Sequence, residues 1–182
     1  MLRPAFNPFP SITTSRLLLR RITTGDAPEI LFFRSNKDTM QYIDKEAATS
    51  IDEVVTFIQH MDELISANDS ILWGIALLED PDKLIGTIGL WRFVKEHFRA
   101  EIGYMLHPDL WRNGIMKEAL GAIIDYSFNT VLLHSIEARI NPLNKASEAL
   151  LISTGFVQEG YFKEDYFFRG EFGDTAVYSR LK

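Results

Sequence analysis

The segment between residues 71 and 128 constrains the fold more than any other part of this sequence. Three runs of apolar residues follow one another there with only short polar turns between them, which predicts neighbouring antiparallel strands. A proline at position 108 ends the third run, and Gly114 opens a strongly apolar helix that reaches about Phe128. The predicted strands are Ile71–Leu78, Leu84–Phe93 and Ala100–Leu106, and the predicted turns are Glu79–Lys83 and a shorter one near Lys95–His97.

The rest of the chain adds strands and helices around this segment. Ser50 and Glu53 form a Ser-x-x-Glu capping box, so a helix is predicted to begin after Ser50. A helix from about Lys145 to Ser153 is predicted to end at Gly155, a residue type common at helix C-caps. This order of elements indicates one mixed α/β domain over residues 1–182. The other predicted elements are an extended arm at 1–11, a strand at Arg16–Ile22, a helix ending near Asn36, a strand at His134–Ile140 and two strands within Phe156–Leu181.

Charge and composition exclude several classes of protein. The chain carries 19 Lys and Arg against 25 Asp and Glu, and the resulting net charge of −6 disfavours a nucleic-acid partner. The absence of cysteine excludes a disulfide scaffold, a thiol nucleophile and a thiolate zinc site. The four histidines lack metal-ligand spacing, so no metal is expected. No apolar run is long enough to span a membrane and the first residues do not resemble a signal peptide, so we expect a cytoplasmic protein.

Gly114 lies where a strand and a short loop lead into a helix, an arrangement that can hold phosphate groups. Backbone N–H groups at a helix start have no partner within the helix, and the helix dipole favours an anion there. Many loops that bind nothing also place a glycine before a helix, so the pattern alone leaves both interpretations open. The sequence contains no G-x-x-x-x-G-K-[ST] and no G-x-G-x-x-G after a strand, which disfavours a P-loop and a dinucleotide-binding fold.

Several motifs, found in the same order along the chain, resemble the GNAT acetyltransferase superfamily, and within it the RimJ/RimL-type N-terminal acetyltransferases of ribosomal proteins. The stretch Trp111–Ala119 (WRNGIMKEA) resembles the pyrophosphate loop and helix start, with Gly114 at the central glycine. Ala100–Pro108 resembles the central strand that ends at the cofactor. The later signature is resembled by Asn144-x-x-Ser147, Gly155-Phe156 and Glu159-Gly160, and the first strand by TTSRLLLRRIT.

The resemblance implies the GNAT fold, in which a mostly antiparallel, twisted sheet of about seven strands is flanked by about four helices. It also implies acetyl-CoA as cosubstrate, with its diphosphate on the backbone around Gly114. Asn144 is then implied to bond to the pantetheine amide, and backbone N–H groups near Met105 and Leu106 to polarise the thioester carbonyl. The other residues implied to contact the cofactor are Asn113, Ile115, Met116 and Arg112, the last either on a phosphate or facing solvent.

The residues implied for proton transfer are Glu101 and Ser147. Glu101 matches a position from which several superfamily members relay a proton through water, and an ion pair or exposure to solvent is the alternative explanation. Ser147 matches the proton donor to the departing thiolate, with capping of its own helix as the alternative. The RimL-like members instead use a glutamate at the position of Tyr166 in this chain, so Glu164 and Asp165 are alternative bases.

The implied reaction is transfer of an acetyl group from acetyl-CoA to a primary amine, by direct attack of the amine on the thioester. An α-amino group loses its proton more readily than lysine, with reference pKa values of about 8 and about 10.4, so the expected acceptor is a protein N-terminus such as that of a ribosomal protein. The alternatives are a small-molecule amine (a polyamine, an aminoglycoside or an amino-acid analogue) and an acyl-CoA-binding domain without turnover, because fold does not define the acceptor. The resemblance also implies a homodimer.

Overall fold

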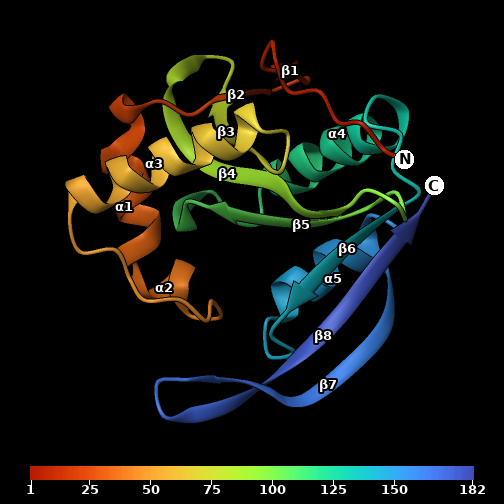
Figure 1. Cartoon of the computed structure of the whole chain (residues 1–182). Coiled ribbons are helices and arrows are strands. Elements are labelled where there is room, and N and C mark those ends of the chain that lie inside the picture. The colour runs from red at the N-terminus through yellow and green to blue at the C-terminus, as the bar shows by residue number, and fades with distance from the viewer.

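The computed structural model describes all 182 residues and contains one eight-stranded sheet with helices on both faces (Figure 1). The strand order is β1-β2-β3-β4-β5-β6-β8-β7, and every neighbouring pair is antiparallel except β5 and β6, which are parallel. The strands are β1 (Ile12–Thr13), β2 (Leu17–Arg21), β3 (Ile71–Leu77), β4 (Asp80–Val94), β5 (Arg99–Leu106), β6 (Ser135–Ile140), β7 (Val157–Phe168) and β8 (Glu171–Leu181). The α-helices are α1 (Ala27–Ser35), α2 (Lys37–Met40), α3 (Ile51–Ser66), α4 (Ile115–Asn129) and α5 (Lys145–Ser153), and two single-turn helices are η1 (Thr24–Asp26) and η2 (Pro108–Leu110).

The predicted fold class is confirmed, because the sheet is mostly antiparallel and α-helices cover it. One strand and one helix exceed the expected seven and four. The additional elements are β1, with two residues, and α2, with four. Elements this short contain too few residues for hydrophobic periodicity to reveal them.

The turn predicted at Glu79–Lys83 is wrong in its position. The chain reverses at Leu78 and Glu79, and β4 begins at Asp80, which pairs with Leu77. The next pair is Ala76 with Leu84, so residues 81–83 have no partner on β3 and form a bulge. Pro81 lacks an N–H group and therefore suits a bulge better than a regular ladder position. The polar residues that suggested a turn instead form an irregular strand start.

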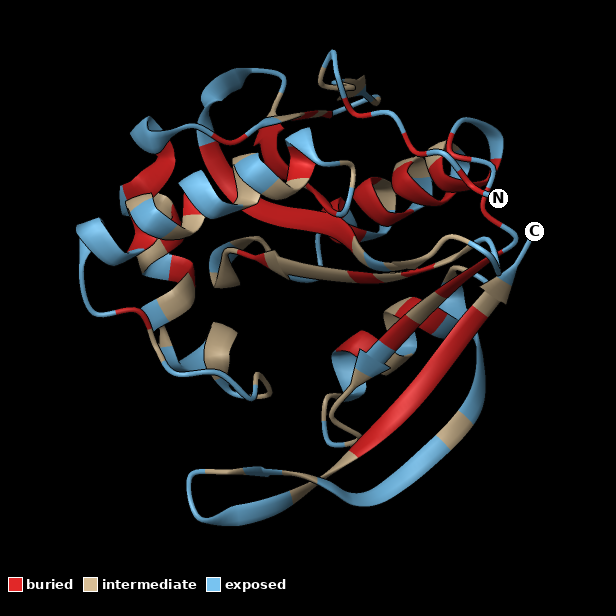
Figure 2. Ribbon diagram, viewed as in Figure 1, coloured by how far each residue is buried: buried red, intermediate tan, exposed pale blue.

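Apolar residues on the two faces of the sheet form two separate clusters. Figure 2 shows that buried residues lie along the central strands and α4. The larger cluster joins α4 and α5 to one face of the sheet and contains Trp73, which is fully buried. The smaller cluster joins α1 and α3 to the opposite face, where Leu72 and Met105 pack against it. Alternation along β3 produces this division, since Trp73 and Leu72 are consecutive and point to opposite faces. The N-terminal arm also reaches the larger cluster, where Leu2 and Phe6 are buried. None of the helices is long and apolar enough to cross a membrane.

The parallel strands β5 and β6 separate along their length, and this divergence creates the site (Figure 1). They pair only where Arg99–Glu101 lie beside Ser135–Glu137. Residues 102–106 of β5 and 138–140 of β6 continue as strands without pairing to each other. The backbone groups of β5 that face β6 are therefore left without sheet partners in this region, in the middle of an otherwise continuous sheet.

Candidate active site

The start of α4 presents a row of unsatisfied backbone amides. None of the amides of residues 112–117 has a hydrogen-bond acceptor within the chain, and the first bond of the helix runs from Glu118 N to Gly114 O, at 3.0 Å. Gly114 is the N-cap and has a φ of 74°. A left-handed φ at this residue favours glycine, because a side chain there clashes with its own backbone. Unpaired amides and the positive end of the helix dipole together form a site that can hold a diphosphate.

Arg16, just before β2, connects this loop to the first turn of α4 through hydrogen bonds. Its Nη1 donates to the carbonyl oxygen of Asn113 at 3.1 Å, and its Nε donates to Glu118 Oε2 at 2.7 Å. Glu118 also accepts from Thr14 Oγ1 at 2.6 Å, from Ser15 Oγ at 2.8 Å and from the backbone N–H of Arg16 at 2.9 Å. Burial raises the pKa of Glu118, but the hydrogen bonds from Thr14, Arg16 and Ser15 outweigh burial and lower that pKa to about 2.

A pair of hydroxyl groups lies beside the β5–β6 gap, the region in which these two strands do not pair. Tyr104 on β5 and Ser147 on α5 lie 2.7 Å apart, oxygen to oxygen. Burial raises the pKa of Tyr104 to about 12, so this phenol is protonated at neutral pH. Asn144 caps α5 by accepting from the backbone N–H of Ser147 at 3.0 Å. The hydroxyl of Ser147 therefore does not cap its helix but faces the phenol of Tyr104.

The two backbone amides predicted to polarise a carbonyl point in opposite directions. The N–H of His107 donates to Ile85 O on β4 at 2.8 Å, and strand alternation then directs the N–H of Met105 towards β4 as well. The N–H of Leu106 faces the gap. The carbonyl of Leu106 also lies on the gap side, where it accepts from Trp111 Nε1 at 2.9 Å. Of the two, Leu106 is the residue whose amide is oriented for that function.

Glu101 lies on the face of β5 opposite Tyr104, because the two residues are an odd number of positions apart. Its carboxylate accepts from Arg92 Nη1 at 2.8 Å and is 13% exposed. Trp91, its partner on β4, lies over Gly103 so closely that no side chain fits at that glycine. Glu101 is thus near the point where β5 and β6 separate, as an ion-paired carboxylate.

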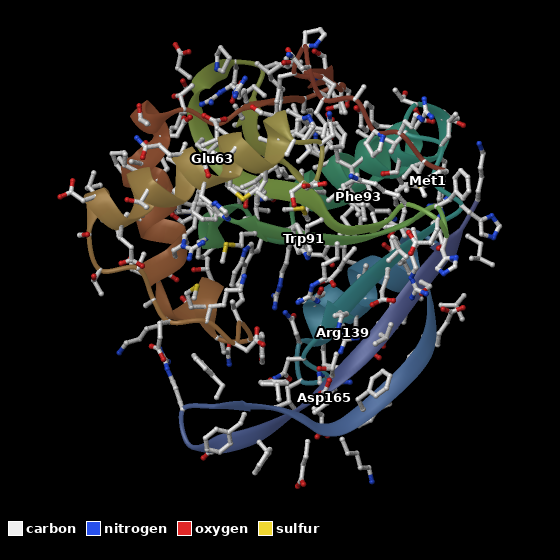
Figure 3. All side chains as sticks on the ribbon, viewed as in Figure 1. Met1, Glu63, Trp91, Phe93, Arg139 and Asp165 are labelled. Carbon is white, nitrogen blue, oxygen red and sulfur yellow. The ribbon has the colours of Figure 1, made fainter.

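Further ion pairs continue across the same face of the sheet. Arg99 binds Glu137, and Arg139 lies 3.7 Å from Glu137 and 3.1 Å from Asp165. Figure 3 shows Arg139 and Asp165 close together between β6 and the β7–β8 hairpin. The carboxylates of Glu101, Glu137 and Asp165 are therefore all engaged by arginines.

The two alternative bases and Tyr166 lie on the hairpin. Glu164 is exposed, and its backbone N–H donates to Asp174 at 2.8 Å. Asp165 pairs with Arg139, as described above. Tyr166 accepts from Asn141 Nδ2 at 3.1 Å and its ring packs against Gly173. No hydrogen bond or ion pair joins the carboxylate of Glu164 or Asp165 to Tyr104 or Ser147.

The structure brings most of the predicted residues to the β5–β6 gap or the helix start that follows it. Asn113, Gly114, Ile115 and Met116 form the loop and first turn of α4, and Ile115 and Met116 also bury their side chains in the core. Arg112 has a φ of 63° in the same loop. Arg16 and Tyr104 also belong to the site, although neither was predicted as a site residue. Arg16 is 102 positions from Glu118, and no local pattern indicates such a contact.

The comparisons with known proteins place the chain in a family. Residues 16–157 match the acetyltransferase (GNAT) domain. The N-acetyltransferase YoaA of Bacillus subtilis is 38% identical over 96% of this chain and 98% of its own length. The chain therefore belongs to the GNAT acetyltransferase family.

Other relatives differ in the acceptor for which they are named. The ribosomal protein uS5-alanine N-acetyltransferase of Escherichia coli is 37% identical, over 55% of this chain and 53% of its own length. Among solved structures, a GNAT-family acetyltransferase from Bacillus anthracis has a TM-score of 0.83 and 28% identity, covering 94% of this chain and 98% of that one. The spermidine N-acetyltransferase from Vibrio cholerae, in complex with CoA and spermine, has a TM-score of 0.81 and 26% identity, covering 92% and 96%.

Proposed function

We propose that this protein transfers the acetyl group of acetyl-CoA to a primary amine, and that the amine is the α-amino group of a protein N-terminus. The observation that carries the proposal is the row of free amides at residues 112–117, which leads directly into the gap holding Tyr104 and Ser147. A diphosphate on these amides leaves the pantetheine arm to follow the unpaired edge of β5. Asn144 would stand beside that arm, with its side-chain N–H groups available as donors. Gly114, Arg112, Asn113, Ile115 and Met116 would provide the phosphate loop.

The reaction follows from the groups in the gap. The amine nitrogen forms a bond to the thioester carbon, and the bond from that carbon to sulfur breaks. The Leu106 N–H stabilises the negative charge that develops on the carbonyl oxygen. The leaving sulfur takes a proton from the hydroxyl of Ser147, which regains one from Tyr104 or solvent, and the amine loses its own proton through water to Glu101.

The surroundings of the gap favour a single amine over a polycation. A polyamine carries several positive charges, and binding them needs carboxylates that are not already neutralised. On the face that carries Glu101, however, the carboxylates of Glu101, Glu137 and Asp165 are paired with arginines. A peptide N-terminus presents one amine followed by backbone carbonyls, which can accept hydrogen bonds from those arginines. The name of the uS5-alanine relative agrees with this acceptor class.

The test is an acceptor panel with acetyl-CoA, in which the release of free thiol is followed for each amine. The panel contains short peptides with free and with blocked N-termini, spermidine, spermine, an aminoglycoside and free amino acids. We expect turnover with unblocked peptides, and none with blocked peptides that keep a lysine. Turnover restricted to spermidine and spermine would replace the proposed acceptor with a polyamine. Tight CoA binding without thiol release from any amine would identify an acyl-CoA-binding domain instead.

A further inference from the structure

The contacts between the β1–β2 turn (residues 14–16) and the start of α4 carry a further inference, which rests on the proposed function. We propose that Arg16 and Glu118 are positioning residues that hold the Asn113–Gly114 peptide with its N–H group directed outward, towards the diphosphate. Neither side chain needs to touch the cofactor for this role. The pair acts on the orientation of one peptide group in the phosphate loop.

The position of the Asn113 carbonyl determines the direction of the Gly114 N–H group, because both belong to one planar peptide. In a trans peptide the C=O and N–H groups point in opposite directions. Arg16 Nη1 holds the Asn113 oxygen on the β2 side, so the N–H of Gly114 points to the other side, where it has no acceptor within the chain. Glycine populates left-handed and right-handed conformations almost equally, so Gly114 by itself does not prevent this peptide from flipping. A flipped peptide would direct a carbonyl oxygen at the diphosphate and repel it.

Glu118 holds Arg16 in place for this task. Its Oε2 accepts from Arg16 Nε, while its Oε1 accepts from the backbone and side chains of residues 14–16. The guanidinium is therefore fixed in a forked arrangement between a carboxylate and a carbonyl, which a lysine cannot reproduce. Glu118 belongs to the first turn of α4, the helix that carries the free amides. The clamp formed by Arg16, Glu118 and the Asn113 carbonyl is therefore attached to that helix.

The solvent exposure of Arg16 allows a positioning role to be distinguished from a role in the stability of the whole fold. The Arg16 side chain is 49% exposed and that of Glu118 is 17% exposed. An ion pair with one partner so exposed contributes little to the stability of the whole fold. Removing the guanidinium alone, which leaves the hydrogen bonds from Thr14, Ser15 and the Arg16 backbone to Glu118 in place, should therefore affect the loop more than the global unfolding transition. That difference can be measured.

The experiment compares the wild type with Arg16→Met and Arg16→Lys, and uses Arg21→Met as the matched control. Arg21 is in β2, and its side chain is 47% exposed and paired with Asp62 on α3, away from the phosphate loop. Calorimetry gives the Kd for CoA, and steady-state kinetics gives kcat and the KM of each substrate. We expect Arg16→Met to raise the Kd for CoA and the KM for acetyl-CoA about tenfold to a hundredfold, the effect of losing charge-assisted bonds. The KM for the amine and the Tm should stay near the wild-type values, and Arg21→Met should change none of these quantities.

A second variant keeps the inference testable if Arg16→Met folds poorly. Glu118→Gln retains an acceptor for Thr14 and for the Arg16 backbone but removes the charge that orients the guanidinium. We expect it to raise the same Kd, by less than Arg16→Met, and the double variant to be no worse than Arg16→Met alone. Unchanged CoA affinity in every variant, with or without a lower Tm, would overturn the inference alone. A wild type that does not bind CoA would overturn the proposed function as well.

Discussion

The hydroxyl oxygen of Tyr104, on the part of β5 that no longer pairs with β6, lies 2.7 Å from that of Ser147 on α5. One residue belongs to a strand before the phosphate loop and the other to a helix 43 positions later, so the divergence of two strands brings them together. Burial raises the pKa of the Tyr104 phenol to about 12, so the phenol is protonated at neutral pH. The pair thus holds a proton beside the place where a thiolate would depart.

This pair predicts a graded loss of turnover. Ser147→Ala should lower kcat by about a hundredfold or more, because a positioned proton donor typically contributes that much. Tyr104→Phe should lower kcat by about tenfold, since it removes one hydrogen bond from the donor but leaves the donor itself. Steady-state kinetics with a peptide acceptor measures both values, and the KM for acetyl-CoA should change little. Equal, small effects of the two substitutions would show that Ser147 gives no proton.

Two glycines of the same helix region provide a matched comparison. Gly114 has a φ of 74°, and alanine there should cost about 1 to 2 kcal/mol in left-handed strain and weaken CoA binding. Gly121 lies inside α4 with open space around it, and alanine there should stabilise the fold by roughly 0.5 to 1 kcal/mol. Urea unfolding measures both free energies.

The aspartate variants of these glycines test the phosphate site itself. Gly114→Asp adds a negative charge next to the diphosphate and should abolish CoA binding on titration. Gly121→Asp adds the same charge away from the helix start and should leave the Kd unchanged. If Gly114→Asp kept its affinity for CoA, the diphosphate could not bind at this loop.

The sequence predicted the framework of the site better than its chemistry. Helix starts carry local signals, and Gly114 and Asn144 were correctly placed as the residues before α4 and α5. The Ser50–Glu53 capping box was only half right. Ser50 accepts from Glu53 N, but the Glu53 carboxylate binds the amide of Thr49.

Contacts between distant elements could not be predicted from the sequence. The gap forms because β5 and β6 stop pairing after Glu101 and Glu137. No residue pattern in the sequence predicts where the pairing of two strands ends. Tyr104 has the alternation of a core strand residue, so its hydroxyl partner on α5 gave no signal in the sequence. The roles assigned to Glu101, Ser147, Arg112 and the other cofactor-binding residues stay predictions, as does the homodimer.

Acid should weaken the clamp on α4 in a defined window. The pKa of Glu118 is about 2 in the folded protein and about 4.3 in an unfolded chain, so its contribution to stability is complete above the unfolded value. That contribution is lost as the pH falls from about 4.5 towards 2, with a slope of at most about 1.4 kcal/mol per pH unit. Urea unfolding of wild type and Glu118→Gln should therefore give free energies that converge over this range. Glu159 is exposed and its side chain makes no hydrogen bond or ion pair, so the free energy of unfolding of Glu159→Gln should differ from that of the wild type by a constant amount over this range. Parallel curves for Glu118→Gln would contradict the assignment.

Glu101 and Arg92 allow the base to be distinguished from an ion-pair partner. If Glu101 accepts the proton of the amine through water, Glu101→Gln should lower kcat/KM at least tenfold at pH values below the pKa of the amine. The deficit should shrink at higher pH, because the amine is then already neutral. Arg92→Gln removes the ion pair but leaves the carboxylate, so any loss of kcat/KM should come from weaker peptide binding and should not change with pH. A pH–rate profile of both variants with one peptide acceptor makes the comparison. Equal losses in the two variants, independent of pH, would show that the ion pair matters and that Glu101 is no base.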